Sequence, residues 1–169
     1  MLLILAGIPG TGKSALAREL SRRLGAAYLR VDKVEAALLN AGQQRVTVEG
    51  YAAAYALAAD NLSLGLSVVA DCVNPVPETR EAWAGVARQA GARLVNVEVI
   101  CSDAAEHRRR VEARHADAEA HAGRWSPPDW EAVRGWDYQP WHSEVWRVDT
   151  AREATETLAS QVLLRLKTS

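Results

Sequence analysis

One short motif near the start of the chain, the run GIPGTGKS at residues 7–14, most constrains how it can fold. The run fits GxxxxGK[S/T], in which glycines let backbone N–H groups turn towards phosphate oxygens. Lys13 is expected to reach the β- and γ-phosphates of a nucleotide, and Ser14 to offer its hydroxyl to Mg²⁺. The motif and the residue after it supply the expected nucleotide contacts: Gly7, Pro9, Gly10, Thr11, Gly12, Lys13, Ser14 and Ala15.

The residues on either side of this motif match the structure that it requires. Residues 2–6 are all apolar, which predicts a short buried parallel strand, and residues 15–20 continue at helical period. A phosphate held between them would lie at a helix N-terminus, where unpaired N–H groups and the helix dipole both favour negative charge. The pattern therefore predicts a strand, a phosphate-binding loop and a helix in that order.

The rest of the chain alternates between strand and helix patterns. We expect further strands at residues 27–31, 67–71, 93–100 and 145–149. Helices are expected up to residue 40, at 51–64, 78–90, 103–114 and 151–167, with a short one after Pro127 and Pro128 and an irregular stretch at 115–123. This alternation predicts one α/β domain over residues 1–169, an open parallel sheet with helices on both faces.

Composition limits the partners and the compartment. A formal net charge of −1 gives no bulk attraction to nucleic acid, so a polyanion would need a local basic patch. Cys72 and Cys101 are the two cysteines, and we interpret them as reduced, mostly buried thiols. The apolar start is too short for a signal peptide or a membrane span. We expect a cytoplasmic protein, monomeric or homodimeric, with no membrane partner.

Two acidic residues follow predicted strands at the edge of the sheet where ligands bind. Asp71 ends the third strand and is expected to orient Mg²⁺, although capping a loop would also explain it. Its neighbour is Cys72 and not a second acid, so no residue at that point would activate water for hydrolysis. Asp32 is the expected general base, and capping the next helix is the alternative. Glu35 could be a second substrate contact or form a surface ion pair.

The helix predicted at 103–114 is rich in arginine and opens an expected lid over about residues 103–135. Positions 107, 110 and 114 share one helical face, so Arg110 and Arg114 can point together at a transferring phosphate. Arg108 and Arg109 would then point away from it. Phosphoryl transfer needs such cations, because its transition state spreads charge over the equatorial oxygens. The alternative is a solvated helix in which Glu106 pairs with Arg110.

Aromatic and imidazole side chains give weaker signals. Five tryptophans lie between the lid and the last strand, at positions 125, 130, 136, 141 and 146. We favour packing over a stacking platform for substrate or adenine. The four histidines lack the spacing of a transition-metal site, so Mg²⁺ is the expected metal.

Four tracts together resemble the small P-loop kinases often described as AAA family ATPases. The tracts are residues 7–14, 58–65, 68–75 and 148–150. This group includes the kinase domains of polynucleotide kinases and is similar to chloramphenicol phosphotransferase, gluconate kinase and zeta toxin. The resemblance implies a P-loop NTPase sandwich of three layers with a five-stranded parallel sheet and an arginine-rich lid.

The resemblance also implies roles for individual residues. It places Lys13 and Ser14 on ATP and Mg²⁺, and it makes Asp32 the general base. It matches Arg110 and Arg114 to the paired lid arginines, and Arg80 to an arginine after the third-strand loop. The tract ending at Thr150 would lead into the loop that holds adenine.

We therefore expect an ATP-dependent kinase that phosphorylates a hydroxyl of a small molecule or nucleoside-like acceptor. The acceptor site is expected to include Asp32, Gln44, Arg45, Tyr51, Asn74 and Arg80. One alternative is a 5′-hydroxyl polynucleotide kinase, in which tryptophans stack on bases and arginines follow the backbone. The other is a nucleotide-gated switch that binds ATP without an acceptor.

Overall fold

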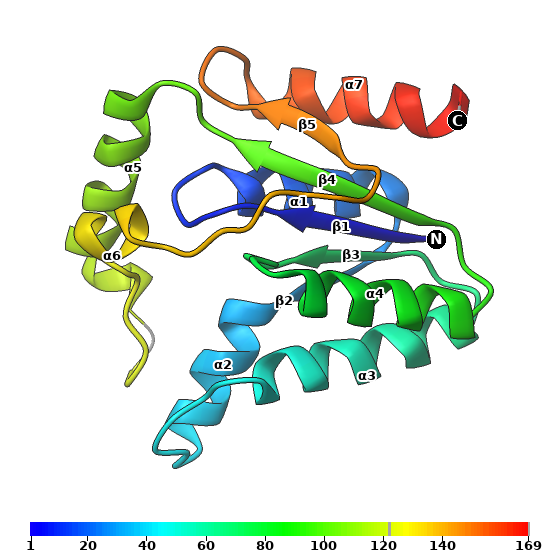
Figure 1. The fold of residues 1–169 in the computed structure, drawn as a ribbon, viewed down its shortest axis with the longest axis horizontal. Coiled ribbons are helices and arrows are strands. Elements are labelled where there is room, and N and C mark those ends of the chain that lie inside the picture. The colour runs from blue at the N-terminus through cyan, green and yellow to red at the C-terminus, as the bar shows by residue number, and fades with distance from the viewer. Residues whose placement is uncertain (122, 169) are drawn as a thin grey trace.

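Five short strands form one parallel sheet in the computed structural model, which describes residues 1–121 and 123–168 (Figure 1). Their order across the sheet is β2-β3-β1-β4-β5, so the strand before the phosphate loop lies in the middle. The strands are β1 (Leu2–Ala6), β2 (Ala27–Arg30), β3 (Val68–Asp71), β4 (Leu94–Ile100) and β5 (Trp146–Asp149). All four pairings are parallel, as the alternating pattern predicted.

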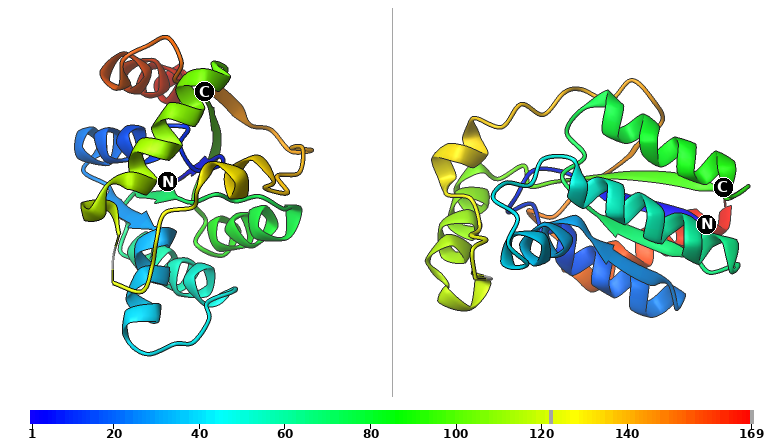
Figure 2. Two further views of the ribbon diagram at one scale, coloured as in Figure 1. Left: turned by 90° about the vertical axis from the view of Figure 1, so that its left-hand side faces the viewer. Right: turned by 90° about the horizontal axis from the view of Figure 1, so that it is seen from below.

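Helices cover both faces of this sheet, and the two faces have separate cores (Figure 2). Helices α1 (Lys13–Leu24) and α7 (Thr155–Thr168) pack on one face, against side chains such as Leu3 and Leu5. Helices α3 (Glu49–Ser63) and α4 (Pro77–Gln89) pack on the other, against Leu2 and Ile4. Successive residues of a strand point to opposite faces, so one fully buried strand supplies both cores. The predicted P-loop NTPase sandwich of three layers is confirmed.

The remaining helices gather at the carboxyl end of the sheet. They are α2 (Val31–Asn40), α5 (Ala104–Ala116), the 3-10 turn η1 (Ala118–Ala120) and α6 (Trp130–Arg134). In Figures 1 and 2, α5 crosses in front of the strand ends with α6 beside it. Asp103 caps α5 by accepting hydrogen bonds from the N–H groups of Ala105 and Glu106, and this cap fixes where the helix begins. Both α5 and α6 fall within the expected lid.

One boundary differs from the prediction and moves a key residue. Strand β2 ends at Arg30, and α2 begins at Val31, so Asp32 lies in the first turn of α2 and not at the end of the strand. Arg30 is the N-cap residue, with extended backbone angles of φ −117° and ψ 113°. The alternative role given for Asp32, the N-cap of this helix, is therefore not the arrangement seen. Its carboxylate still lies where the helix dipole favours negative charge.

Two other features bear on the sequence predictions. No helix within residues 1–121 and 123–168 has the length and hydropathy needed to cross a membrane. Cys72 and Cys101 are both free thiols, the first buried and the second partly exposed. Burial and the nearby charge of Asp71 raise the pKa of the Cys72 thiol well above its usual value, so this thiol is not a nucleophile.

Candidate active site

The phosphate loop connects β1 to α1 in a conformation that its glycines make possible. Gly7, Gly10 and Gly12 have φ angles of 145°, 86° and 87°, in the region that side chains rarely adopt. A Cβ atom on Gly7 would collide with the carbonyl oxygen of Val99 on the neighbouring strand. The loop therefore passes so close to β4 that only glycine fits at position 7.

Lys13 is buried inside this loop. Its residue is only 8% exposed, and its Nζ donates a hydrogen bond of 3.2 Å to the carbonyl oxygen of Ile8. Burial lowers the pKa of Lys13, while the charges of Asp71 and Asp32 partly oppose that shift. The ammonium group has no direct bond to either carboxylate, so an anion entering the loop would gain a poorly solvated cation as its partner.

A phosphate pocket of about 260 Å³ lies at the N-terminus of α1. Five expected nucleotide contacts line it, namely Gly10, Gly12, Lys13, Ser14 and Ala15. Its other walls are four arginines: Arg18, Arg30, Arg110 and Arg114. The expectation that Arg110 and Arg114 face one point is thus met by the geometry. So many cations around one cavity suit a polyanion such as a triphosphate.

Arg110 connects α5 to two other segments of the site. Its Nε contacts Glu106 Oε1 at 2.7 Å, the pairing given above as the alternative, but its other nitrogens donate to the Oγ1 and carbonyl oxygen of Thr150 at 2.9 and 3.0 Å. The Thr150 hydroxyl in turn donates to the carbonyl oxygen of Thr11 at 2.7 Å. Thr150 therefore joins the end of β5 to both the phosphate loop and the lid.

Asp32 lies between two arginines at the other side of the pocket. Its Oδ2 is 3.0 Å from Arg30 Nη2 and 3.4 Å from Arg114 Nη2. Burial acts to raise the pKa of Asp32, but the positive charges of Lys13, Arg30 and Arg114 outweigh it and lower that pKa. The carboxylate is therefore ionised at neutral pH and can accept a proton.

The other two arginines of α5 point away, as expected. Arg108 pairs with Glu112 and Arg109 with Glu106, and their side chains are 60% and 68% exposed. These exposed pairs contribute little to stability. The lid helix therefore divides its arginines between a solvent face and a face towards the phosphate pocket.

Asp71 is buried at the end of β3, next to the strand that leads into the phosphate loop. Its Oδ2 accepts a hydrogen bond of 2.8 Å from the hydroxyl of Tyr28 and lies 3.6 Å from Arg30 Nε. Burial and the charge of Asp71 raise the pKa of Tyr28 to about 12, so the phenol stays a donor. The carboxylate of Asp71 and the hydroxyl of Ser14 are the hard oxygen ligands that suit Mg²⁺ bound to phosphates and water.

Two expected acceptor contacts lie in the connection between α2 and α3. Gln44 and Arg45 are both exposed there, and neither lines the phosphate pocket. The structure therefore does not bring them together with Asp32 and Lys13. Their contact with an acceptor stays a prediction.

Tyr51 and Asn74 lie closer to the site and contact each other. The backbone N–H of Asn74 donates to the Tyr51 hydroxyl at 2.8 Å. Asn74 has a positive φ of 52°, its residue is 0% exposed, and neither polar atom of its side chain has a partner in the described chain. A substrate could not reach this amide in the conformation seen here, so its role in binding also stays a prediction.

Arg80 serves a structural purpose in this arrangement. Its guanidinium donates to four backbone carbonyls, from residues 74, 75, 139 and 140, at 2.7 to 3.1 Å. It also lies over the rings of Trp141 and Tyr138, 4.2 and 5.2 Å from their centroids. These contacts bind the segment before β5 to the loop after β3. Contact between Arg80 and an acceptor is a prediction that this geometry does not favour.

The tryptophans do not form one cluster. Trp146 packs in the core beside α1 and α7, and Trp141 lies over Arg80. Trp130 contacts His107 edge-on, whereas Trp125 lies beneath Arg114. Packing thus accounts for Trp141 and Trp146, and Trp125 is the tryptophan placed beside Asp32.

The sequence reading missed three residues around the two carboxylates: Arg18, Tyr28 and Arg30. All three line a cavity of about 410 Å³ that also contains Asp32 and Trp125, here named the Asp32 cavity. This cavity shares Arg18, Arg30 and Arg114 with the phosphate pocket, so the two adjoin. Arg18 follows Ser14 by one helical turn, a spacing that could have revealed it.

Comparisons with known proteins agree with this arrangement. The sequence profile of the AAA domain family matches residues 2–126. No curated protein matches the sequence. Among solved structures, a provisionally assigned kinase from Chloroflexus aurantiacus has a TM-score of 0.74 and 23% identity, covering 99% of this chain and 96% of its own.

Two further structures extend the comparison. The Mycobacterium tuberculosis APS kinase CysC, solved with AMPPNP and APS, has a TM-score of 0.68 and 21% identity, covering 98% of this chain and 96% of its own. Chaetomium thermophilum Kti12, solved with ADP-AlF3, has a TM-score of 0.71 and 18% identity, covering 99% and 98%. At these identities the likeness establishes the fold. The chain thus belongs to the AAA domain family and has the fold of the small P-loop kinases.

Proposed function

We propose that this protein is an ATP-dependent kinase that transfers the γ-phosphoryl group to a hydroxyl of a small molecule or nucleoside-like acceptor. The observation that carries the proposal is the position of Asp32, an ionised carboxylate between Arg30 and Arg114. The positive charge of Lys13 also lowers the pKa of this carboxylate. A proton acceptor thereby adjoins the groups that would hold the transferring phosphate.

Each residue has a definite part in the proposed reaction. Lys13 and the loop N–H groups hold the phosphates, and Ser14 and Asp71 would hold Mg²⁺, which neutralises phosphate charge when bound. Asp32 accepts the proton of the acceptor hydroxyl while that oxygen bonds to the γ-phosphorus and the bond to the bridging oxygen breaks. Arg110 and Arg114 stabilise the charge on the transferring group.

The arrangement also indicates what must move. Arg114 contacts Asp32 and Arg110 contacts Thr150, so in this conformation both guanidinium groups bind protein atoms. Both already line the phosphate pocket, so phosphate oxygens can take over part of these contacts with small side-chain movements. Releasing Arg114 would also leave Asp32 free to approach the acceptor.

The size of the Asp32 cavity favours a small acceptor. Its volume of about 410 Å³ lies within the range of about 300 to 1,000 Å³ usual for small-molecule sites. A 5′-hydroxyl polynucleotide kinase would need an extended groove and a basic surface, and the net charge of −1 gives no general attraction to nucleic acid.

The test is phosphoryl transfer by the Asp32→Asn variant. Wild type and variant would be incubated with γ-labelled ATP and a fractionated small-molecule library, with labelled products identified by mass spectrometry. We expect transfer to fall about a hundredfold or more while ATP still binds. Asp60→Asn, which changes an exposed carboxylate on α3, is the matched control and should keep wild-type activity.

Three outcomes would count against the proposal. Wild-type turnover by Asp32→Asn would exclude Asp32 as the base. Labelling of an oligonucleotide in preference to every small-molecule fraction would favour a polynucleotide kinase. ATP binding with no labelled product in any fraction, together with ATP affinity that depends on a protein partner, would favour a nucleotide-gated switch.

A further inference from the structure

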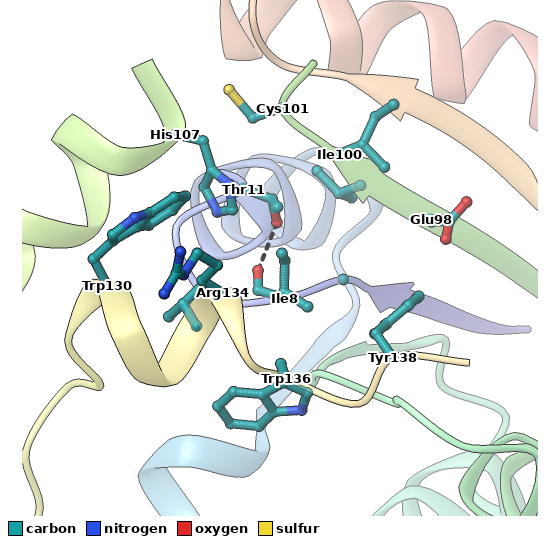
Figure 3. A pocket seen from close by; sticks show the side chains of 13 residues that line it. Ile8, Thr11, Glu98, Ile100, Cys101, His107, Trp130, Arg134, Trp136 and Tyr138 are labelled. Atoms are coloured by element: carbon teal, nitrogen blue, oxygen red, sulfur yellow. Dashed lines mark hydrogen bonds between the residues drawn. The ribbon is translucent and has the colours of Figure 1, made fainter. Parts of the chain in front are cut away.

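A cavity of about 340 Å³ lies on the other side of the phosphate loop (Figure 3). It is enclosed by the loop, the end of β4, and α6 with the residues that follow it. We name it the aromatic cavity, because most of its wall consists of aromatic and aliphatic side chains. These include Ile8, Val99, Ile100, Trp130, Val133 and Trp136.

Two charged side chains, Glu98 and Arg134, interrupt this apolar wall, and Arg134 is exposed and pairs with Glu131. Glu98, on β4, lines the cavity although its residue is only 7% exposed. Its Oε2 accepts a hydrogen bond of 2.7 Å from Arg147 Nε, and Arg147 is the one partner of this carboxylate in the described part of the chain. In Figure 3 Glu98 lies at the side of the cavity opposite Trp130 and Arg134. Its second oxygen therefore retains capacity to accept a hydrogen bond from a molecule in the cavity.

The aromatic cavity is distinct from the two cavities of the proposed transfer site, although its wall includes Gly7, Ile8 and Thr11 of the phosphate loop. It shares no lining residue with either the phosphate pocket or the Asp32 cavity. Glu98 lies on β4 and Asp32 directly follows β2, and β3 and β1 lie between these strands. Three strand spacings amount to about 14 Å. A ring-sized molecule beside Glu98 therefore cannot also reach Asp32.

From these observations we propose that the aromatic cavity binds a compact, ring-bearing apolar molecule with one hydrogen-bond donor, which it presents to Glu98. A pocket with mostly apolar walls and a few polar groups that fix orientation is the usual form of a small-molecule site. A buried carboxylate whose second oxygen retains acceptor capacity favours a ligand that donates to it, because hydrogen bonds to charged groups are stronger than those between neutral groups.

The experiment compares two probes of nearly equal shape, p-cresol and p-xylene, which differ in one hydroxyl. Binding to the full chain would be followed by calorimetry and by the NMR signals of the tryptophan indole N–H groups. We expect the signals of Trp130 and Trp136 to shift, while that of Trp83, on the buried face of α4, stays unchanged. p-Cresol should bind about tenfold more tightly than p-xylene, the factor that one hydrogen bond to a carboxylate provides.

Three variants test the assignment of the donor to Glu98. Glu98→Leu should remove the preference for p-cresol, leaving equal affinities for the two probes. Arg147→Met keeps the carboxylate and removes its exposed partner, so it should retain or increase the preference. Trp136→Ala, at a residue that is 38% exposed, should lower the affinity for both probes equally without disturbing the core.

Several results would overturn the proposal. These are shifts at Trp83 in place of Trp130 and Trp136, equal affinity of the wild type for both probes, or an unchanged preference in Glu98→Leu. Absence of binding by either probe would also overturn it. Transfer of label from γ-labelled ATP to p-cresol would show that the cavity belongs to the transfer site. That last result would leave the proposed kinase function intact, so the two proposals can fail separately.

Discussion

The phosphate loop and the helix α5 meet at one pocket, but they are held in place by different means. The loop is a continuous run of eight residues fixed by its own backbone and by close contact with β4. Helix α5 reaches the rest of the site through side chains, which join His107 to the carbonyl oxygen of Pro9, Arg110 to Thr150, and Arg114 to Asp32. The loop is therefore preformed, whereas the contacts of α5 can be exchanged for contacts with phosphate.

This difference implies different consequences when a cation is removed from each region. A cation of the loop should matter both for holding the nucleotide and for the transition state. A cation of α5 should matter mainly for the transition state, because its ground-state contacts are with protein atoms. The first two of the four predictions below test this comparison, and the last two concern the stability of the structure around the site.

Replacement of Lys13 by Met should have the largest effect. We expect phosphoryl transfer to fall by about a thousandfold or more and ATP affinity to fall as well, because the buried ammonium group is lost from the centre of the loop. Transfer of label from γ-labelled ATP and calorimetric binding of ATP would measure the two effects. Unchanged ATP affinity would contradict the role given to the loop.

Replacement of Arg114 by Met should lower the rate about a hundredfold and change ATP affinity much less. The same substitution at Arg108, on the solvent face of the same helix, is the matched control and should leave both quantities unchanged. Equal losses of rate and ATP affinity in Arg114→Met would show that α5 holds the ground state as the loop does. The comparison between the two regions would then fail.

The same contrast explains what could be predicted from the sequence. The strand, loop and helix around residues 7–14 follow from contiguous residues, and the structure confirms them. The position of Asp32 in the first turn of α2 depends on where that helix begins. The identities of Arg30 and Val31 do not determine which of the two is the first residue with helical backbone angles. The bridge from Arg30 to both Asp32 and Asp71 joins two strands, so it required the strand order.

The acceptor side was the least predictable, for a related reason. Arg80 is a charged residue that follows the third-strand loop, where a contact with the acceptor was expected. Its four carbonyl partners come from two segments, residues 74–75 and 139–140, and no local pattern indicates that these segments meet. Likewise, the wall of the aromatic cavity comes from the loop, β4 and α6, and the sequence showed only that tryptophans are frequent near α6.

Arg80 gives a prediction about stability. Replacing it by Met should lower the free energy of unfolding by about 3 kcal/mol, because four backbone carbonyl groups lose their charged donor. Arg88→Met is the control, since that side chain is exposed and pairs with exposed Glu81. Denaturant unfolding would measure both. A loss of unfolding free energy below about 1 kcal/mol would mean that Arg80 does not hold these two segments together. Contact between Arg80 and an acceptor would then be favoured again.

The smallest expected effect concerns Glu35, one helical turn after Asp32. Burial, and then the charge of Asp32, raise the pKa of Glu35 from 4.5 to about 7, so the folded chain binds more protons than the unfolded chain between these pH values. Ionising this carboxyl therefore lowers the free energy of unfolding as pH rises through that window. The full shift corresponds to at most about 3 kcal/mol, and we expect about 1 kcal/mol because the side chain keeps access to water.

Glu35→Gln should therefore gain about 1 kcal/mol over wild type when pH is raised from 4.5 to 8, and the two should be equally stable at the lower pH. Glutamine has nearly the same shape, which matters because Gly50 packs directly against the Glu35 side chain. Glu144→Gln, at an exposed position, should show no such gain. Urea unfolding at several pH values measures the difference, and parallel curves for wild type and Glu35→Gln would show that Glu35 ionises freely. The charge of Asp32 raises the pKa of Glu35 in addition to burial, so adding Asp32→Asn should reduce part of the gain, whereas Lys13→Met should leave it in place.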